Sequence, residues 1–470
     1  MKKRWTIFFY SFLIGGTLSA QIINKMVQSE NLKSANMSIL LKNIETGQTL
    51  LQHRSEKVAT PASTTKLITT ATALELLGTD FRFETFLEYD GVIEENGVLT
   101  GNLYIRGGGD PTLGSRYIGD ANFLAKWTDA VKNLGIKEIK GSVIGDASLF
   151  NSESISPKWT WEDMGNYYAS GTYALSVADN TCTVYLKSGD VGTTPEIIRI
   201  DPDIPNMRFN PQLKATGITS DSAYFYGIPL VNERIIYGAI PANKAEFPVK
   251  ADIPNPPLFL AQLFSKSLIE NGIRVGNEAM ANFEKGQNRI LFYTHYSPPL
   301  TEIVKEINYR SNNHYAEHLF RYLALQKYPI ASSNGAIAVI KEFWNSKGIN
   351  TSSVFLYDGC GLSPCDAIPA NFLVSILEYM YTKSPKKNVF VASLPIAGED
   401  GTVKNLLKNS KLKGKVHAKS GSISAVQCFA GYLEWKTQTY AFALMINNYT
   451  GSRKEVVRQL ETLLLSITAY

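Results

Sequence analysis

The feature that most constrains the fold is a change of pattern between the middle of the 470-residue chain and its ends. Between about residues 83 and 290, short strand-like runs alternate with Gly and Pro turns. The runs lie at 99–106, 137–144, 181–187, 196–200 and 233–240. Two helical patterns, near 122–134 and 258–271, interrupt them, and helices dominate after Pro298-Pro299. The pattern predicts a helix-rich domain split by a strand-rich insertion of about 200 residues.

The two ends supply the remaining elements of the helix-rich domain. A helix is expected to open with Thr60 as its N-cap and Pro61 in its first turn, and to close at Gly78. An amphipathic helix is expected from Ser452. Strands are expected on either side of the insertion, at 37–42, 49–53, 416–419, 426–434 and 440–447.

The first twenty residues have the pattern of an export signal. Residues 2–4 are basic, 5–14 are apolar, and 18–20 end on a small residue, so Gln21 is the expected first residue of the mature chain. An uncleaved anchor is the alternative, although the apolar run is short for a span of about 20 residues. The net charge of +5 includes the three basic residues of this segment, and no basic block elsewhere indicates nucleic-acid binding. We expect a periplasmic protein without a transmembrane helix in its mature part.

Export would expose the four cysteines to oxidation. Cys360 and Cys365 are separated by a turn-like Gly-Leu-Ser-Pro and could close a small disulfide loop. Free buried thiols are equally open, above all for Cys182 and Cys428, which lie in strand-like runs. No second C-x-x-C and no nearby His complete a zinc site around them.

Ser63 and Lys66 form an S-x-x-K motif that places a hydroxyl and an amine one helical turn apart. A serine needs a base to become a nucleophile, and a lysine can act as that base when burial lowers its pKa. The motif alone is weak evidence, because it recurs at Ser384 and Ser410. Both of these lie in Lys-rich stretches that are typical of a solvated surface.

The order of three short motifs narrows the candidates. S-x-N occurs at four serines and K-S-G at two lysines. In the order S-x-x-K, S-x-N, K-S-G, Ser63 is followed by Ser311 or Ser332 and then by Lys419. Ser311 lies between two predicted helices that can hold it rigidly, whereas Ser332 lies in an ordinary surface turn. Gly421, at the end of K-S-G, is expected to let a ligand approach the strand backbone.

These three motifs resemble the signatures of penicillin-binding proteins and serine β-lactamases. The first gap, which holds the insertion, is much longer than in a class A β-lactamase. The chain therefore resembles the class C low-molecular-mass penicillin-binding proteins, the D-alanyl-D-alanine carboxypeptidase/endopeptidases of the penicillin-binding protein 4 type. Further stretches support the resemblance, at 61–67, 107–113, 145–148, 159–163 and 394–402.

The resemblance implies a mixed α/β (α+β) fold, with an antiparallel sheet flanked by helices, of the serine β-lactamase/DD-peptidase kind. We expect a signal peptide at 1–20 and a DD-peptidase domain formed by 21–88 and 289–470. The inserted strand-rich region is then 89–288, either as one module or as two nested modules with the inner one at about 178–250.

The same resemblance implies a set of catalytic roles. Ser63 would attack the carbonyl of the penultimate D-Ala of a peptidoglycan stem peptide, and neutral Lys66 would take its proton. Ser311 would relay a proton to the leaving amine. β-Lactam antibiotics would acylate the same serine, and no metal or cofactor would be required.

The implied substrate-binding residues follow the second and third motifs. Asn313 would hydrogen-bond the peptide, Lys419 would supply positive potential, and Ser420 would bind the terminal carboxylate. The backbone N–H groups of Ser63 and Ser422 would form an oxyanion hole.

The chain departs from the family in one place. Where the family reads D-G-S-G-L-S-R, residues 358–364 read D-G-C-G-L-S-P. Cys360 replaces Ser, and Pro364 replaces an Arg that resembles a substrate-carboxylate contact. This leaves the preference for the diamino-acid side chain of the stem peptide open.

Three other functions compete with this one. His314 and His318 fit H-x-x-E-H, the zinc motif of inverted metallopeptidases. A serine β-lactamase would share Ser63 and Lys66 but needs a base for fast deacylation, and none is identified. A non-catalytic wall-binding protein would have no need of the intact nucleophile and base.

Overall fold

The computed structural model describes residues 21–286 and 288–469, so the expected signal peptide at 1–20 lies outside the described residues. The chain forms two compact units. The first unit contains the described residues of Met1–Asp80, Leu300–Asn312 and Ile337–Tyr470. The second contains Phe81–Pro299 and Asn313–Ala336. Among the described residues, no helix has the length and apolar character needed to cross a membrane.

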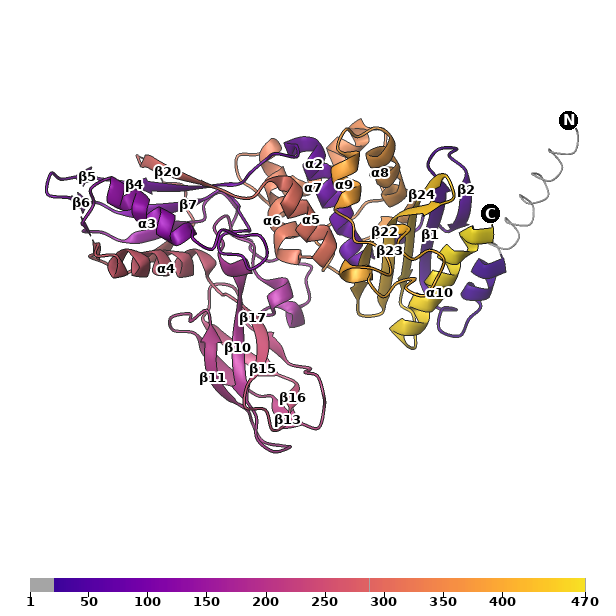
Figure 1. Cartoon of the computed structure of the whole chain (residues 1–470), viewed down its shortest axis with the longest axis horizontal. Coiled ribbons are helices and arrows are strands. Elements are labelled where there is room, and N and C mark those ends of the chain that lie inside the picture. The colour runs from indigo at the N-terminus through magenta and orange to yellow at the C-terminus, as the bar shows by residue number, and fades with distance from the viewer. Residues whose placement is uncertain (1–20, 287, 470) are drawn as a thin grey trace, which may run out of the picture. The chain divides into compact units, whose positions relative to one another are not determined.

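The first unit is built on a five-stranded antiparallel sheet in the order β2-β1-β24-β23-β22. Its strands are β1 (Asn36–Asn43), β2 (Thr49–His53), β22 (Val416–Ile423), β23 (Val426–Trp435) and β24 (Gln438–Asn447). Figure 1 shows indigo β1 beside yellow β24, so the sheet joins the two ends of the chain. The expected strands at both ends are confirmed.

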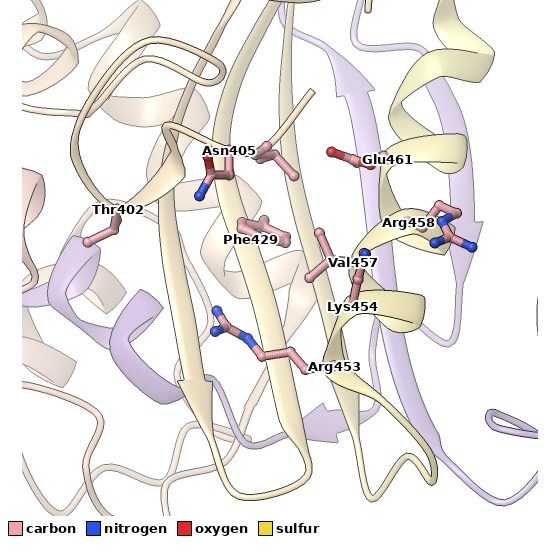
Figure 2. Close-up of a pocket in the computed structure, with 9 residues that line it drawn as sticks. Thr402, Asn405, Phe429, Arg453, Lys454, Val457, Arg458 and Glu461 are labelled. Atoms are coloured by element: carbon pink, nitrogen blue, oxygen red, sulfur yellow. The ribbon is translucent and has the colours of Figure 1, made fainter. Parts of the chain in front are cut away.

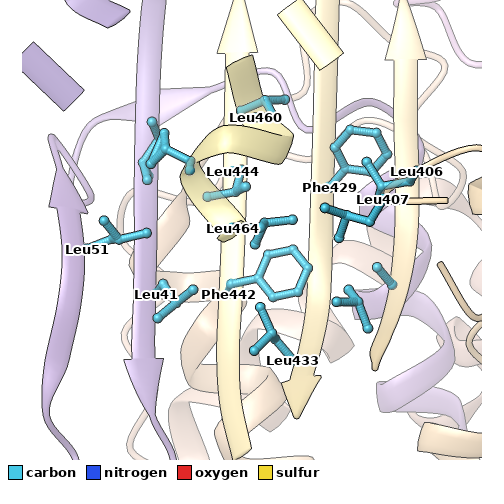
Figure 3. Packing of buried hydrophobic residues seen from close by; sticks show 14 of the residues in the cluster. Leu41, Leu51, Leu406, Leu407, Phe429, Leu433, Phe442, Leu444, Leu460 and Leu464 are labelled. Atoms are coloured by element: carbon cyan, nitrogen blue, oxygen red, sulfur yellow. The ribbon is translucent and has the colours of Figure 1, made fainter. Parts of the chain in front are cut away.

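The two faces of this sheet are covered differently because side chains alternate along each strand. On β24 the large residues Phe442 and Leu444 point into an apolar core that includes Leu460 and Leu464 of α10 (Arg453–Leu465) (Figure 3). Alternate positions carry small residues such as Ala443. The helix α8 (Ala370–Thr382) packs against β24 and β1.

The helix that carries the first motif begins later than expected. Thr60 is not the N-cap, because Pro61 occupies that position and the Thr60 hydroxyl donates to the Pro364 carbonyl oxygen at 3.4 Å. A 3-10 turn, Ala62–Thr64, follows Pro61, and α2 (Thr65–Leu77) continues from it. Gly78 ends the helix as predicted.

The second unit contains most of the short strands. The larger sheets have the orders β19-β9-β7-β4-β20 and β18-β8-β6-β5, and the helices α3 (Phe123–Asn133) and α4 (Pro256–Glu270) confirm the two predicted helical patterns. Three smaller sheets, β11-β10-β17, β12-β15-β14 and β13-β16, complete the unit. The strands are β4 (Glu84–Tyr89), β5 (Val92–Ile93), β6 (Val98–Thr100), β7 (Leu103–Gly107), β8 (Glu138–Ile139), β9 (Val143–Asp146), β10 (Thr181–Lys187), β11 (Glu196–Asp201), β12 (Arg208–Pro211), β13 (Lys214–Thr216), β14 (Tyr224–Tyr226), β15 (Glu233–Tyr237), β16 (Ala239–Pro241), β17 (Phe247–Asp252), β18 (Arg274–Val275), β19 (Met280–Asn282) and β20 (Ile290–Tyr296).

Three runs predicted as single strands are each two strands. The runs at 99–106, 137–144 and 233–240 break at Gly101, Gly141 and Gly238, where the chain passes from one sheet to another. A Cβ at any of these glycines would lie 2.1–2.3 Å from a neighbouring oxygen atom. The glycines permit two strands to approach each other closely at these points. The alternation of apolar residues along the sequence does not reveal this approach.

Candidate active site

Ser63 and Lys66 lie in contact at the start of α2. The 3-10 turn leaves Ser63 partly exposed, while Lys66 is fully buried. Lys66 Nζ donates hydrogen bonds to Ser63 Oγ at 3.1 Å and to the carbonyl oxygen of Cys360 at 2.6 Å. The amine of the first motif is thereby fixed against the hydroxyl that it would deprotonate.

A second lysine–serine pair brings the other two motifs together. Ser311 lies between α5 (Leu300–Arg310) and α6 (Asn313–Leu323), with a left-handed φ of 62°. The fully buried Lys419 Nζ donates to Ser311 Oγ at 2.8 Å and to the carbonyl oxygen of Ser420 at 2.7 Å. Burial, and secondarily the charge of Lys66, lowers the pKa of Lys419 well below its ordinary value.

The strand β22 runs beside the turn that carries the nucleophile. A Cβ on Gly421 would lie 2.7 Å from the Pro61 carbonyl oxygen and 3.0 Å from the Ser63 nitrogen. Gly421 therefore allows β22 to approach the protein's own Ser63 turn, while the expected approach of a ligand to this strand stays a prediction.

The remaining two predicted site residues on β22 are Ser420 and Ser422. Ser420 is partly exposed and its Oγ bonds Thr402 Oγ1 at 2.8 Å. Ser422 is exposed and lies opposite Gln427 of β23. Thr402 was not predicted as a site residue, although it ends one of the stretches that carry the family resemblance.

The loop at 358–363 is shaped by one buried carboxylate. Asp358 accepts backbone N–H groups from Cys360, Gly361 and Ser363 at 3.2, 2.6 and 2.7 Å. This arrangement presents the Cys360 carbonyl to Lys66. Sequence reasoning missed this acceptor because a main-chain oxygen leaves no residue-type signature.

Asn313 belongs to the second unit, at the first position of α6. Its side-chain amide donates to the carbonyl oxygen of Tyr168 at 2.8 Å. The role expected for Asn313 stays a prediction.

The two histidines of α6 are not arranged as zinc ligands. His318 Nδ1 lies 2.9 Å from the Gly109 carbonyl oxygen, and its Nε2 lies 3.1 Å from Ser176 Oγ. Both ring nitrogens are engaged, so no lone pair of His318 remains for a metal. Burial lowers the pKa of His314 to about 3, as expected for a neutral packed ring.

All four cysteines are free. Cys182, Cys360 and Cys428 are buried, and Cys365 is exposed. The disulfide considered for Cys360 and Cys365 is not formed.

The fold and the paired serine–lysine motifs define a serine peptidase of the acyl-enzyme type. The D-Ala-D-Ala carboxypeptidase 3 (S13) family matches residues 18–466, and the chain belongs to this family. The fold class and the enzyme class expected from the sequence are both confirmed.

Individual relatives agree with this assignment. The chain is 30% identical over 432 residues to the D-alanyl-D-alanine carboxypeptidase DacB of Haemophilus influenzae, covering 89% of this chain and 86% of the relative. It is 27% identical over 448 residues to a D-alanyl-D-alanine carboxypeptidase of Actinomadura sp. (strain R39), covering 91% and 81%. The crystal structure of penicillin-binding protein 4 from Haemophilus influenzae matches with a TM-score of 0.84 and 25% identity, covering 96% of this chain and 99% of that one.

Proposed function

We propose that this chain hydrolyses the D-alanyl-D-alanine bond of peptidoglycan stem peptides through an acyl-enzyme on Ser63. The observation that carries this proposal is the 3.1 Å contact between Ser63 Oγ and the buried Lys66 Nζ. Because a β-lactam presents a similar acyl group, it acylates the same serine. The N-terminal pattern supports export of the enzyme to the periplasm, where this substrate lies.

In the acylation step, neutral Lys66 takes the proton of Ser63 as Oγ attacks the carbonyl carbon. The Cys360 carbonyl accepts one N–H of Lys66, which holds Nζ within hydrogen-bond distance of Ser63 Oγ, where it can accept the serine proton. The backbone N–H groups of Ser63 and Ser422 bind the developing oxyanion. Removal of a single oxyanion donor typically costs about 10²–10³ in kcat.

The leaving amine must receive a proton when the peptide bond breaks. Ser311 delivers it, and the proton returns to the hydroxyl from Lys419, whose Nζ is 2.8 Å away. In the empty site burial favours neutral Lys419. A substrate carboxylate at Ser420 raises the pKa of Lys419, so binding protonates the lysine that supplies the positive potential. Water then hydrolyses the ester.

Intact-mass spectrometry after penicillin treatment tests the nucleophile. We expect one adduct per chain on the wild type and none on Ser63→Ala. Ser410→Ala is the matched control, because Ser410 belongs to another S-x-x-K sequence, and it should keep the adduct. A wild type without an adduct, or an adduct that survives Ser63→Ala, would defeat the proposal. Rapid turnover of nitrocefin in place of a long-lived adduct would indicate a β-lactamase.

A further inference from the structure

Gln427 of β23 is a fully buried polar residue that lies opposite Ser422 of β22. Its side-chain oxygen Oε1 accepts a hydrogen bond from Arg453 Nε at 2.6 Å. Because a guanidinium can only donate, the other end of the carboxamide is the nitrogen Nε2. Nε2 donates to the carbonyl oxygens of Gly421 and Cys428, each at 3.3 Å. The carboxamide therefore has one fixed orientation, and it links α10 to the main chain of β22.

Arg453 is the first residue of α10 and lines a groove of about 660 Å³ beside β23. Figure 2 shows its side chain reaching from α10 across the sheet. Arg453 is exposed and forms no ion pair with any described residue, so its bond to Gln427 Oε1 keeps the full charge of the guanidinium. A charge-assisted bond of this kind polarises the accepting amide and strengthens the hydrogen bonds that this amide donates.

The Gly421 carbonyl that accepts from Gln427 belongs to the same peptide unit as the Ser422 N–H. A peptide unit is planar and trans, so its C=O and N–H point in opposite directions and turn together. β22 is the last strand in the order of the described five-stranded sheet, so this peptide unit is held from the side of β23. The hydrogen bonds to the Gly421 carbonyl therefore set the direction of the Ser422 N–H.

We propose that Gln427 and Arg453 are positioning residues for the oxyanion hole, and that together they aim and polarise the Ser422 N–H. This inference rests on the proposed function, in which that N–H binds the oxyanion formed when Ser63 attacks. The charge of Arg453 acts through two amide groups in series, the carboxamide of Gln427 and the peptide unit 421–422. Each amide accepts at its oxygen and donates from its nitrogen, so both dipoles point their positive ends toward the oxyanion.

Gln427→Glu separates the hydrogen bond to β22 from the contact with α10. A carboxylate has nearly the shape of the carboxamide and pairs with Arg453, but it cannot donate to the Gly421 carbonyl. We expect penicillin to acylate Ser63 about tenfold more slowly in this variant, which is less than the factor of about 10²–10³ for a lost donor because the Ser422 N–H remains. If Gln427 only tied α10 to the sheet, the ion pair would preserve the wild-type rate.

Arg453→Met tests the charge without changing the buried residue. We expect about a threefold slower acylation, since water screens an exposed guanidinium. Lys454→Met is the matched control, because Lys454 is the next exposed cation of α10 and lines the same groove. It should acylate at the wild-type rate.

The stretching frequency of the acyl-enzyme ester carbonyl reports on the oxyanion hole itself, because hydrogen bonds to the carbonyl oxygen lower this frequency. Infrared difference spectra with a penicillin labelled with ¹³C at the β-lactam carbonyl isolate the band. We expect a higher frequency in Gln427→Glu and Arg453→Met than in the wild type, and the wild-type frequency in Lys454→Met. A purely structural role for the two residues would not move this band.

The outcomes separate this inference from the proposed function. A wild-type rate and band in Gln427→Glu would overturn the inference, and so would a slower rate with an unchanged band, because the oxyanion hole would then be unaffected. Equal changes in Arg453→Met and Lys454→Met would overturn the role of Arg453. A wild type that forms no penicillin adduct would defeat the proposed function and this inference with it.

Discussion

The close approach of Gly361 to the Ser63 turn provides a quantitative test of how rigidly the site is held. Gly361 has a left-handed φ of 78° and is buried. A Cβ at this position would lie 1.8 Å from the Ala62 carbonyl oxygen, whereas real Cβ contacts begin near 3.0 Å. In Gly361→Ala, the loop or the turn must therefore move by about 1.2 Å, the difference between these distances. Ala62 is bonded directly to Ser63, so the movement reaches the nucleophile.

Gly348→Ala is the matched control, because it separates the effect of the steric contact with Ala62 from the effect of the left-handed backbone conformation. Gly348 has a φ of 79°, and its Cβ would meet nothing within 4 Å. Both variants pay about 1–2 kcal/mol for a left-handed L-residue, partly offset by about 0.4–1 kcal/mol from the unfolded state. Gly361→Ala adds the steric displacement, for which overpacking typically costs about 1–3 kcal/mol. It also weakens the hydrogen bond from neutral Lys66 to Cys360, for which about 0.5–1.5 kcal/mol is typical.

The assays are thermal unfolding and the second-order rate of penicillin acylation. We expect Gly348→Ala to acylate at the wild-type rate with a small decrease in Tm. Gly361→Ala should lose about 2–3 kcal/mol more and acylate about 10²-fold more slowly, since a misplacement of about 1 Å can cost that factor. Equal unfolding temperatures and equal acylation rates in the two variants would refute the reasoning, because the contact would then relax without moving Ser63.

Two further predictions concern charge. Binding of a D-Ala-D-Ala peptide to Ser63→Ala should take up protons, because the substrate carboxylate favours the charged form of Lys419. The affinity for the peptide should therefore fall as the pH rises above the lowered pKa of Lys419. Calorimetry in buffers of different ionisation enthalpy measures the proton uptake, and an amidated peptide should show none. Arg234→Met should destabilise the second unit by about 3–5 kcal/mol, because the side chains of Arg234 and its carboxylate partner are only 0% and 4% exposed. Arg199→Met removes one member of an ion pair that is 46% exposed on each side, so it should lower the stability by less than about 1 kcal/mol. Equal shifts in unfolding temperature would contradict the second prediction.

Much of the helix-rich unit could be predicted because its patterns are long and regular. The strands β23 and β24 are apolar over most of their length and end at clear turns, and Ser452 caps α10 by accepting the N–H of Glu455. The strands of the other unit were less predictable. Apolar residues continue through runs such as 99–106, so a local pattern cannot show that the chain bends at Gly101 and that the two halves belong to different sheets.

In the active site, the side chains could be predicted from the sequence and the main-chain geometry could not. Ser63, Lys66, Ser311 and Lys419 could be found because hydroxyl and amine residues in a fixed order leave a readable signature. The start of α2 could not be placed, since the Ser63 turn is set by a left-handed Ala62 and by contacts with β22. Those are long-range constraints that no window of sequence contains.

The loop at 358–364, where the chain departs from the family's motif, shows which residues the site needs for their side chains and which only for their main chain. Position 360 contributes its carbonyl oxygen to Lys66, and every residue type offers that oxygen, so replacement of Ser by a buried Cys leaves the contact intact. Asp358 and Gly361 are different, because the carboxylate accepts three N–H groups and the glycine has no room for a Cβ. Pro364 is exposed. The exchange at 360 therefore leaves the contact with Lys66 in place, whereas an effect of Pro364 on the choice of stem peptide stays a prediction.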